Sequence, residues 1–170
     1  IGTAVSDACE SASENALMVT EISSFQLETI HEFRAHVSAI LNLTPDHLDR
    51  HKTFEGYIAA KGRITENQTM EDYFVYNADD PETEKFAAGI AHVNKVPFSA
   101  GKHCAELAAL ENAAYVEKGV LVVKKGGKLQ KLCRTDELQI PGHHNLENAL
   151  AAAAIAVFAD IPAKFVRRTL

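Results

Sequence analysis

Short runs of apolar residues recur along the first hundred positions and predict buried strands. Two of them, 16–20 and 37–41, are nearly unbroken, which is typical of strands covered on both faces of a parallel sheet. Shorter apolar runs at 73–76 and 93–98 predict two more strands, and a helical pattern covers 81–88 between them. This alternation of strand and helix predicts an α/β fold with a doubly wound, mostly parallel sheet.

The pattern changes between about residues 113 and 133. Three strand-like segments follow one another there, with Lys118-Gly119 and Gly126-Gly127 at the positions where tight turns are needed. This region predicts a small antiparallel β meander that forms a subdomain. After Pro141-Gly142, an alanine-rich stretch from roughly 144 to 158 predicts a helix, because alanine combines high helix propensity with small volume.

Composition narrows the class of protein. The 170 residues are 46% hydrophobic, enough for one domain with its own core, and they contain no run long enough to cross a membrane. The formal net charge of −6 argues against a nucleic-acid-binding surface. Three widely spaced cysteines argue against a disulfide framework and favour a cytoplasmic protein. The chain starts without Met and stops within a helical pattern, so we expect a piece of a longer protein.

Polar side chains follow the first two apolar runs. Glu21 comes directly after the first, so we expect its carboxylate at the carboxyl edge of the sheet, where a hard oxygen ligand suits Mg²⁺. His47 follows the second run beside Asp46, and an imidazole with a carboxylate neighbour is a common metal-binding pair. Each residue has a simpler alternative. Glu21 would cap the helix that begins near Ser23 or Ser24, and His47 would be an ordinary loop histidine.

Three further candidates lie on predicted helices. By pattern alone Lys61 is a solvated lysine, but in a partly desolvated site its neutral amine would add CO₂ and give a carbamate, an anionic oxygen ligand. Asn145 and Asn148 are spaced i, i+3, so both amides lie on one face of the alanine-rich helix. An amide matches the hydrogen-bonding edge of adenine, and the alternative role of these residues is helix capping.

Four segments in this order resemble the middle domain of the Mur ligases, ATP-dependent enzymes that add amino acids to the peptidoglycan precursor. They are Glu-Ile-Ser-Ser-Phe-Gln-Leu-Glu at 21–28, the stretch at 42–54 that contains Thr-Pro-Asp-His-Leu-Asp, the helical Tyr-Ile-Ala-Ala-Lys at 57–61 and His-His-Asn-Leu-Glu-Asn-Ala-Leu at 143–150. The first segment resembles the D-glutamate-adding branch, since the diaminopimelate- or lysine-adding enzymes tend to carry His where this chain has Phe25.

The resemblance implies a reaction. In this branch ATP phosphorylates the carboxylate of UDP-N-acetylmuramoyl-L-alanine, and the amine of D-glutamate attacks the acyl phosphate to give the amide, ADP and phosphate. By the same resemblance, Glu21 would bind the Mg²⁺ that accompanies the nucleotide. His47 and a carbamylated Lys61 would bind a second Mg²⁺ and act as catalytic residues.

The remaining implied roles concern the organic ligands. Ser23 would contact substrate, and Asn145 and Asn148 would orient the adenine of ATP. The family's phosphate loop, of the type Gly-x-x-Gly-Lys-Thr/Ser, appears nowhere in the chain, and Ile1-Gly2-Thr3 looks like the remainder of a Gly-Asn-Ile-Gly turn. We therefore expect 1–170 to be a middle-domain piece without the N-terminal and C-terminal domains, and to be inactive alone.

The missing phosphate-loop strand would leave a gap in the sheet. We expect the isolated piece to fill that gap either by dimerisation or by a rearranged segment 4–13.

Three other interpretations remain open. A folylpolyglutamate synthase shares the chemistry, although its motifs would not give Ser-Phe-Gln-Leu-Glu. A hydrolase with a carbamylated lysine would need a His-x-His pair, whereas His143 and His144 are adjacent. A folded domain that only binds partners would describe the isolated piece equally well.

Overall fold

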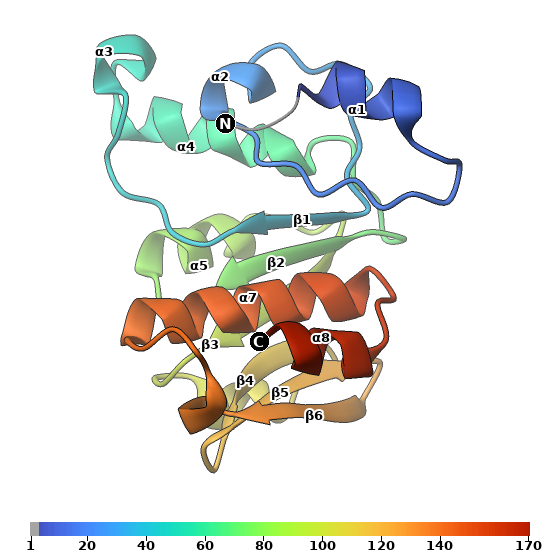
Figure 1. Ribbon diagram of the computed structural model, residues 1–170. Coiled ribbons are helices and arrows are strands. Elements are labelled where there is room, and N and C mark those ends of the chain that lie inside the picture. Colours follow the sequence, from blue (N-terminus) through green and yellow to red (C-terminus); the bar gives the residue numbers. More distant parts are fainter. Residues whose placement is uncertain (1–3) are drawn as a thin grey trace.

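The computed structural model describes residues 4–170 and is built around one six-stranded sheet (Figure 1). Strands β1 to β4 pair in parallel and β4 to β6 pair antiparallel, so the predicted α/β class with a mostly parallel sheet is confirmed. The expected meander is present and continues this sheet. The strands, in spatial order, are β1 (Val37–Ile40), β2 (Tyr73–Asn77), β3 (Asn94–Ser99), β4 (Ala113–Glu117), β5 (Val120–Lys125) and β6 (Lys128–Arg134).

Helices cover both faces of the sheet. One face carries α7 (His143–Phe158) and α8 (Ala163–Thr169), and the other carries α4 (Phe54–Gly62), α5 (Pro81–Ala88) and α6 (Cys104–Leu107). The predicted helix at 81–88 is confirmed, and the alanine-rich helix begins one residue earlier than expected. The shorter helices are α1 (Val5–Ser11), α2 (Ser24–Leu27), α3 (Leu48–His51) and the 3-10 turns η1 (Arg63–Thr65) and η2 (Thr135–Glu137).

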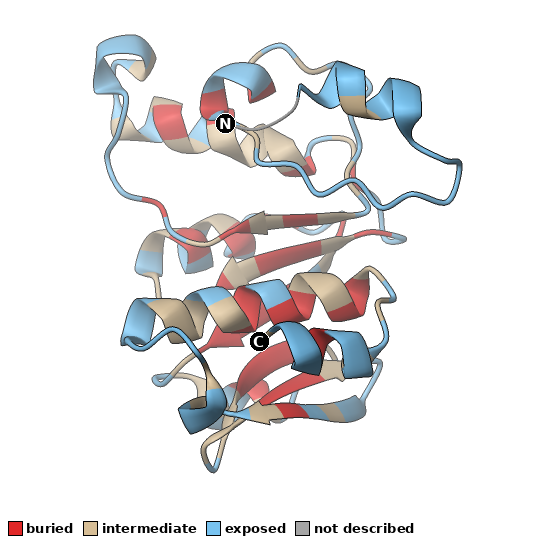
Figure 2. Ribbon diagram, viewed as in Figure 1, coloured by how far each residue is buried: buried red, intermediate tan, exposed pale blue. Residues whose placement is uncertain are grey.

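The core follows the two-residue period of the strands. On β2, Val75 faces the cluster beneath α7 while its neighbour Phe74 faces the cluster beneath α4 and α5, and both are fully buried. Ala153 and Ala154 of α7 are also fully buried, so small side chains let this helix lie close to the sheet. Figure 2 shows this buried centre. No helix in the described part of the chain is long and apolar enough to cross a membrane.

Both hairpins of the meander turn through two residues. Glu117 pairs with Val120 around Lys118-Gly119, and the next hairpin turns through Gly126-Gly127. All four turn residues have positive φ, at 50°, 75°, 56° and 76° in chain order. This conformation belongs to the hairpin turn whose twist matches that of the strands, and glycine adopts it at little cost. The predicted tight turns are confirmed.

The strand predicted at 16–20 is wrong. These residues have no strand partner in the sheet, and they are exposed, Leu17 at 61% and Val19 at 92%. Strand formation requires a neighbouring backbone as well as apolar side chains, and β1 pairs with β2 alone among the described strands. In Figure 2 the segment between α1 and α2 is correspondingly coloured mostly as exposed. The motif residues 1–3 lie outside the described residues.

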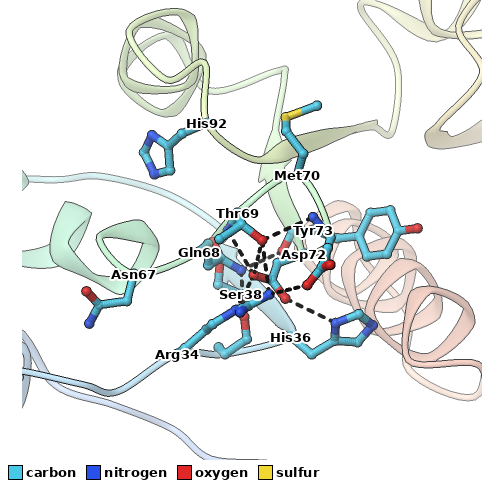
Figure 3. A network of polar contacts seen from close by, with 12 residues as sticks. Arg34, His36, Ser38, Asn67, Gln68, Thr69, Met70, Asp72, Tyr73 and His92 are labelled. Atoms are coloured by element: carbon cyan, nitrogen blue, oxygen red, sulfur yellow. Dashed lines mark hydrogen bonds and ion pairs between the residues drawn. The ribbon is translucent and has the colours of Figure 1, made fainter.

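A polar network joins the amino ends of β1 and β2 (Figure 3). The Asp72 carboxylate, 3% exposed, accepts hydrogen bonds from Arg34 Nε at 2.6 Å and the Thr69 amide at 2.9 Å, and lies 3.2 Å from His36 Nδ1. Burial by itself would raise the pKa of Asp72, but these donors outweigh it and lower the pKa. The network lies at the amino ends of the parallel strands, away from the carboxyl ends where ligands bind. Its role is therefore to stabilise the fold.

Candidate functional site

Ser23 directly precedes the helical turn α2 and caps it with its polar groups. Its hydroxyl accepts a hydrogen bond from the Gln26 amide at 3.3 Å, and its own amide donates to Gln26 Oε1 at 2.9 Å. This reciprocal capping box satisfies two backbone donors at the helix start. Ser23 therefore fills the capping role considered for Glu21, which lies two residues earlier with an exposed side chain. Because 16–20 is not a strand, Glu21 does not come at the carboxyl end of a strand, as had been expected.

His47 lies after β1, directly before the single turn of α3. Its backbone has φ 52° and ψ 34°, a left-handed conformation that non-glycine residues rarely adopt. The amide donates to Asp46 Oδ1 at 2.8 Å, and ring Nε2 lies 3.5 Å from Asp46 Oδ2, so the expected carboxylate neighbour is present. The side chain is 47% exposed, which leaves the ring accessible to a ligand.

Lys61 lies near the end of α4 with a partly buried side chain. Its Nζ is 5.4 Å from the centre of the Tyr57 ring, one turn earlier on the same helix. Tyr57 is buried, so the ammonium group rests on the edge of the core against an aromatic face. The Lys61 amine is therefore neither fully solvated nor fully desolvated.

Aromatic contacts join the segments that carry His47 and Lys61. The Phe25 ring lies 4.9 Å from the His47 ring and stacks on His51 at 5.6 Å, and His51 meets Tyr57 edge-on at 5.6 Å. Helices α2, α3 and α4 therefore form one packed group beside β1 (Figure 1). Glu21 is tied to this group through the chain just before α2. The structure brings the three segments together, and a common metal site for Glu21, His47 and Lys61 stays a prediction.

The side chains of this group fit Mg²⁺ only in part. Among the described residues, no three His, Cys, Asp or Glu side chains are grouped so that they would hold a metal ion. The Glu21 carboxylate is a hard oxygen donor, whereas an ammonium group cannot bind a cation. Lys61 could therefore contribute to metal binding only as its carbamate.

The start of α7 forms the second part of the site. Gly142, with φ 111°, occupies the cap position, so neither Asn145 nor Asn148 caps the helix. The Asn145 side-chain amide donates to the Pro141 carbonyl at 2.8 Å, and its side-chain oxygen has no hydrogen-bond partner among the described residues; Asn148 is exposed one turn later. Beside this turn lies an open cavity of about 500 Å³ whose lining includes the apolar side chains of Leu138, Ile140, Pro141 and Leu146.

Polar residues at the end of β2 belong to the same edge and were missed by the sequence analysis. Asn77 Nδ2 donates to Glu147 Oε1 of α7 at 3.3 Å. Asp79 accepts hydrogen bonds from the hydroxyl of Ser99, the last residue of β3, at 2.8 Å and from the Ala100 amide at 2.9 Å. The signal was present, because Asn77-Ala78-Asp79 directly follows a predicted strand, as His47 follows another.

The sheet and its carboxyl-edge residues define an α/β domain of the open-sheet class, which binds ligands where its parallel strands end. The sequence profile of the Mur ligase middle domain matches residues 3–156. The chain therefore belongs to the Mur ligase middle-domain family, as the motifs predicted.

Curated relatives that carry a ligase name match almost the whole chain. It is 47% identical over 159 residues to the UDP-N-acetylmuramoylalanine–D-glutamate ligase of Thermoanaerobacter sp. (strain X514), covering 94% of this chain and 34% of that protein. It is 43% identical over 170 residues to the ligase of the same name from Clostridioides difficile (strain 630), covering 100% of this chain and 36% of that protein. The chain thus spans about a third of the length of these relatives.

Solved structures support the fold. The structure of UDP-N-acetylmuramoyl-L-alanyl-D-glutamate–2,6-diaminopimelate ligase matches with a TM-score of 0.60 at 20% identity, covering 86% of this chain and 30% of that one. MurF from Acinetobacter baumannii matches with a TM-score of 0.57 at 19% identity, covering 81% of this chain and 29% of that one. At this level of identity the likeness establishes the fold alone.

Proposed function

We propose that this chain is the middle domain of an ADP-forming ligase that joins D-glutamate to UDP-N-acetylmuramoyl-L-alanine in peptidoglycan synthesis. The observation that carries the proposal is the identity of 43–47% with ligases of that name over almost the whole chain. The segment Ser23–Glu28 supports the same branch. Since the chain covers about a third of these relatives, the complete reaction belongs to a longer protein.

Three residues are proposed to act on the phosphate side of the reaction. Mg²⁺, when bound, would neutralise the charge that gathers between the γ-phosphate and the substrate carboxylate. The Glu21 carboxylate would hold the cation that accompanies ATP. His47 would hold a second cation together with the carbamate of Lys61, and the exposure of the His47 ring supports this role. Tyr57 would form the apolar wall against which Lys61 rests.

The start of α7 is proposed to bind the adenine. The free carbonyl oxygen of Asn145 and the exposed amide of Asn148 offer the acceptor and donor pair that an adenine edge requires. The adjacent open cavity, about 500 Å³ in volume, has room for a base, and its lining combines apolar side chains with Thr135, Asp136 and His143. The exposed Ser23 would contact the substrate next to Glu21.

The isolated chain is proposed to be inactive. No Gly-x-x-Gly-Lys-Thr/Ser loop occurs in the 170 residues, so the domain alone would lack most phosphate contacts and be inactive. A cytoplasmic location is proposed with the reaction, and the free thiols of Cys9, Cys104 and Cys133 agree with a reducing compartment.

The test is an assay of amino-acid-dependent ADP release. A full-length ligase carrying this domain is supplied with ATP, Mg²⁺, UDP-N-acetylmuramoyl-L-alanine and one amino acid at a time. We expect release with D-glutamate and background rates with L-lysine or diaminopimelate. Equal or greater release with L-lysine or diaminopimelate would contradict the proposed branch, and release that needs a folate substrate would indicate the folylpolyglutamate type.

A further inference from the structure

Ser24, His51 and Glu28 form a linked series between α2 and α3, which we call the buried relay. Ser24 Oγ lies 3.0 Å from His51 Nε2, and His51 Nδ1 lies 3.3 Å from Glu28 Oε1. Ser24 and the side chain of His51 are each 3% exposed. The Ser24–His51 contact is therefore buried, while Glu28, 28% exposed, closes the series at the surface.

The order of these groups matches a serine hydrolase triad, but their surroundings exclude that chemistry. A nucleophilic serine must present its Oγ to a substrate carbonyl, with hydrogen-bond donors placed for the oxyanion. Ser24 is buried in the first turn of α2, so no substrate reaches its hydroxyl. The buried relay therefore acts by holding structure in place.

The charge on Glu28 determines where the protons lie. Arg50 donates to Glu28 Oε2 from Nε at 3.1 Å and from a terminal nitrogen at 2.5 Å, and this hydrogen bonding lowers the pKa of Glu28. An ionised carboxylate only accepts, so His51 presents a proton on Nδ1 toward Glu28. In the neutral imidazole, Nε2 is then the acceptor, and the Ser24 hydroxyl donates to it.

One aromatic ring connects the buried relay to His47. Phe25 follows Ser24 in the chain, stacks on His51 with ring planes 6° apart, and contacts the His47 ring at 4.9 Å. His47 has a left-handed backbone, a conformation that persists in non-glycine residues when the surroundings hold it. His47 precedes the four-residue turn of α3, and His51 ends that turn. Anchoring His51 therefore fixes the turn that carries His47.

We propose that Ser24, His51 and Glu28 are positioning residues for His47. By locking α3 onto α2, they set where the His47 imidazole lies relative to Ser23 and Glu21, which precede α2. This inference rests on the proposed role of His47 as a metal ligand. Groups that orient a metal ligand typically change metal affinity by about 10- to 100-fold when they are removed.

The test compares His51→Phe with His51→Gln in a full-length ligase carrying this domain. Phenylalanine keeps the stacking on Phe25 but removes the hydrogen bond to Ser24 and the polar contact with Glu28, whereas glutamine keeps a donor and an acceptor. The readouts are the imidazole NMR signal of His47 in ¹³C-histidine-labelled protein, assigned with His47→Gln, and the Mg²⁺ concentration that gives half-maximal rate. We expect His51→Phe to move the His47 signal and raise that concentration about tenfold or more. We expect His51→Gln to stay within about threefold of the parent.

Each outcome decides the proposal. If His51→Phe lowers the melting temperature but leaves both the His47 signal and the Mg²⁺ requirement unchanged, the buried relay only stabilises the fold and the proposal is wrong. If His51→Phe does not fold, Ser24→Ala removes one hydroxyl and is judged by the same two readouts. If His47→Gln itself leaves the Mg²⁺ requirement unchanged, the proposed metal role of His47 fails, while a moved His47 signal in His51→Phe would still support positioning.

Discussion

Individual side chains near the site are constrained by neighbours that a motif does not reveal. Ser23 is read from the sequence as a substrate contact, yet both its hydroxyl and its amide are engaged with Gln26. Lys61 is read as a carbamate, yet its amine rests against Tyr57. These contacts do not exclude the proposed roles. They mean that a substitution at either position also perturbs local structure, so that tests need a matched control.

Replacing Lys61 separates its proposed chemistry from its packing. We expect Lys61→Ala to lower the rate of a full-length ligase on the order of 100-fold or more, because it removes a group proposed to stabilise charge in the transition state. ¹³C NMR of the wild-type protein in ¹³C-bicarbonate should show a carbamate signal that is absent from the variant. Lys85→Ala, an exposed lysine on α5, is the matched control and should keep both rate and signal. A carbamate signal that survives in Lys61→Ala would rule out this lysine as the modified one.

The Asp72 network should make stability depend on pH. The pKa of Asp72 is lowered in the folded protein, so its contribution is fully present above the ordinary value of 3.8 and is lost as the pH falls through the lowered pKa. We expect Asp72→Asn to cost about 1–3 kcal/mol of unfolding free energy at pH 7, and the difference from wild type to shrink below about pH 4. Urea unfolding at both pH values measures this.

The matched control for Asp72 is Glu71→Gln. Glu71 pairs with the same arginine, Arg34, but is 83% exposed, so its removal should change stability by no more than about 0.5 kcal/mol. An Asp72→Asn cost that stays constant from pH 7 to pH 3 would show that the carboxylate charge is not what stabilises this edge.

At the level of whole elements, the two apolar runs at 16–20 and 37–41 show what periodicity can and cannot predict. Both runs have the composition of a buried strand, but only the second has a neighbouring backbone to pair with, namely β2. Pairing partners are a property of the whole fold, which a local window does not contain. The meander was predictable because its turns impose the pairing locally, with Gly126-Gly127 forcing adjacent strands together.

Helix α5 is specified locally and offers a direct test. The Asp80 side chain accepts a hydrogen bond from the Thr83 amide at 2.8 Å, and Pro81 follows in the first helical position. We expect Asp80→Ala to cost about 1 kcal/mol of unfolding free energy, because the amide loses its cap. Asp80→Asn keeps an oxygen acceptor and should cost only a few tenths of a kcal/mol of unfolding free energy. Equal losses for the two variants in urea unfolding would mean that the charge of Asp80, and not its capping, matters.

For the whole molecule, chain order was enough to predict the strands from β1 to β6, although not that 16–20 stays outside the sheet. His47 follows β1 as expected, and Asn145 and Asn148 lie in the first turns of α7. The distances between these parts were not predictable, because they depend on packing between α2, α3 and α4. Phe25 illustrates this difference. Its place in the motif indicated the branch of the family, but its contacts with His47 and His51 arise only in the folded group.

The two edges of the sheet differ in a way that predicts how the isolated chain associates. The β6 edge carries the charged residues Lys128, Lys131 and Arg134, which oppose pairing with another chain. The β1 edge reads Val-Ser-Ala-Ile, without charge, and has no second partner among the described strands. Leu17, Met18 and Val19 add further exposed apolar surface. Unprotected edges of this kind favour pairing between copies.

We therefore expect the 170-residue chain on its own to form dimers as its concentration rises through the micromolar range, with β1 at the interface. The double substitution Leu17→Lys and Val19→Lys should weaken this association, because it replaces exposed apolar side chains with charges that repel one another between copies. Met70→Lys is the matched control, since Met70 is an equally exposed apolar residue, 61% against 61% for Leu17, at the amino edge. Light scattering across the concentration range measures the effect. A monomer at every concentration would refute the prediction, and equal weakening by Met70→Lys would show that general apolar exposure drives association, independently of the β1 edge.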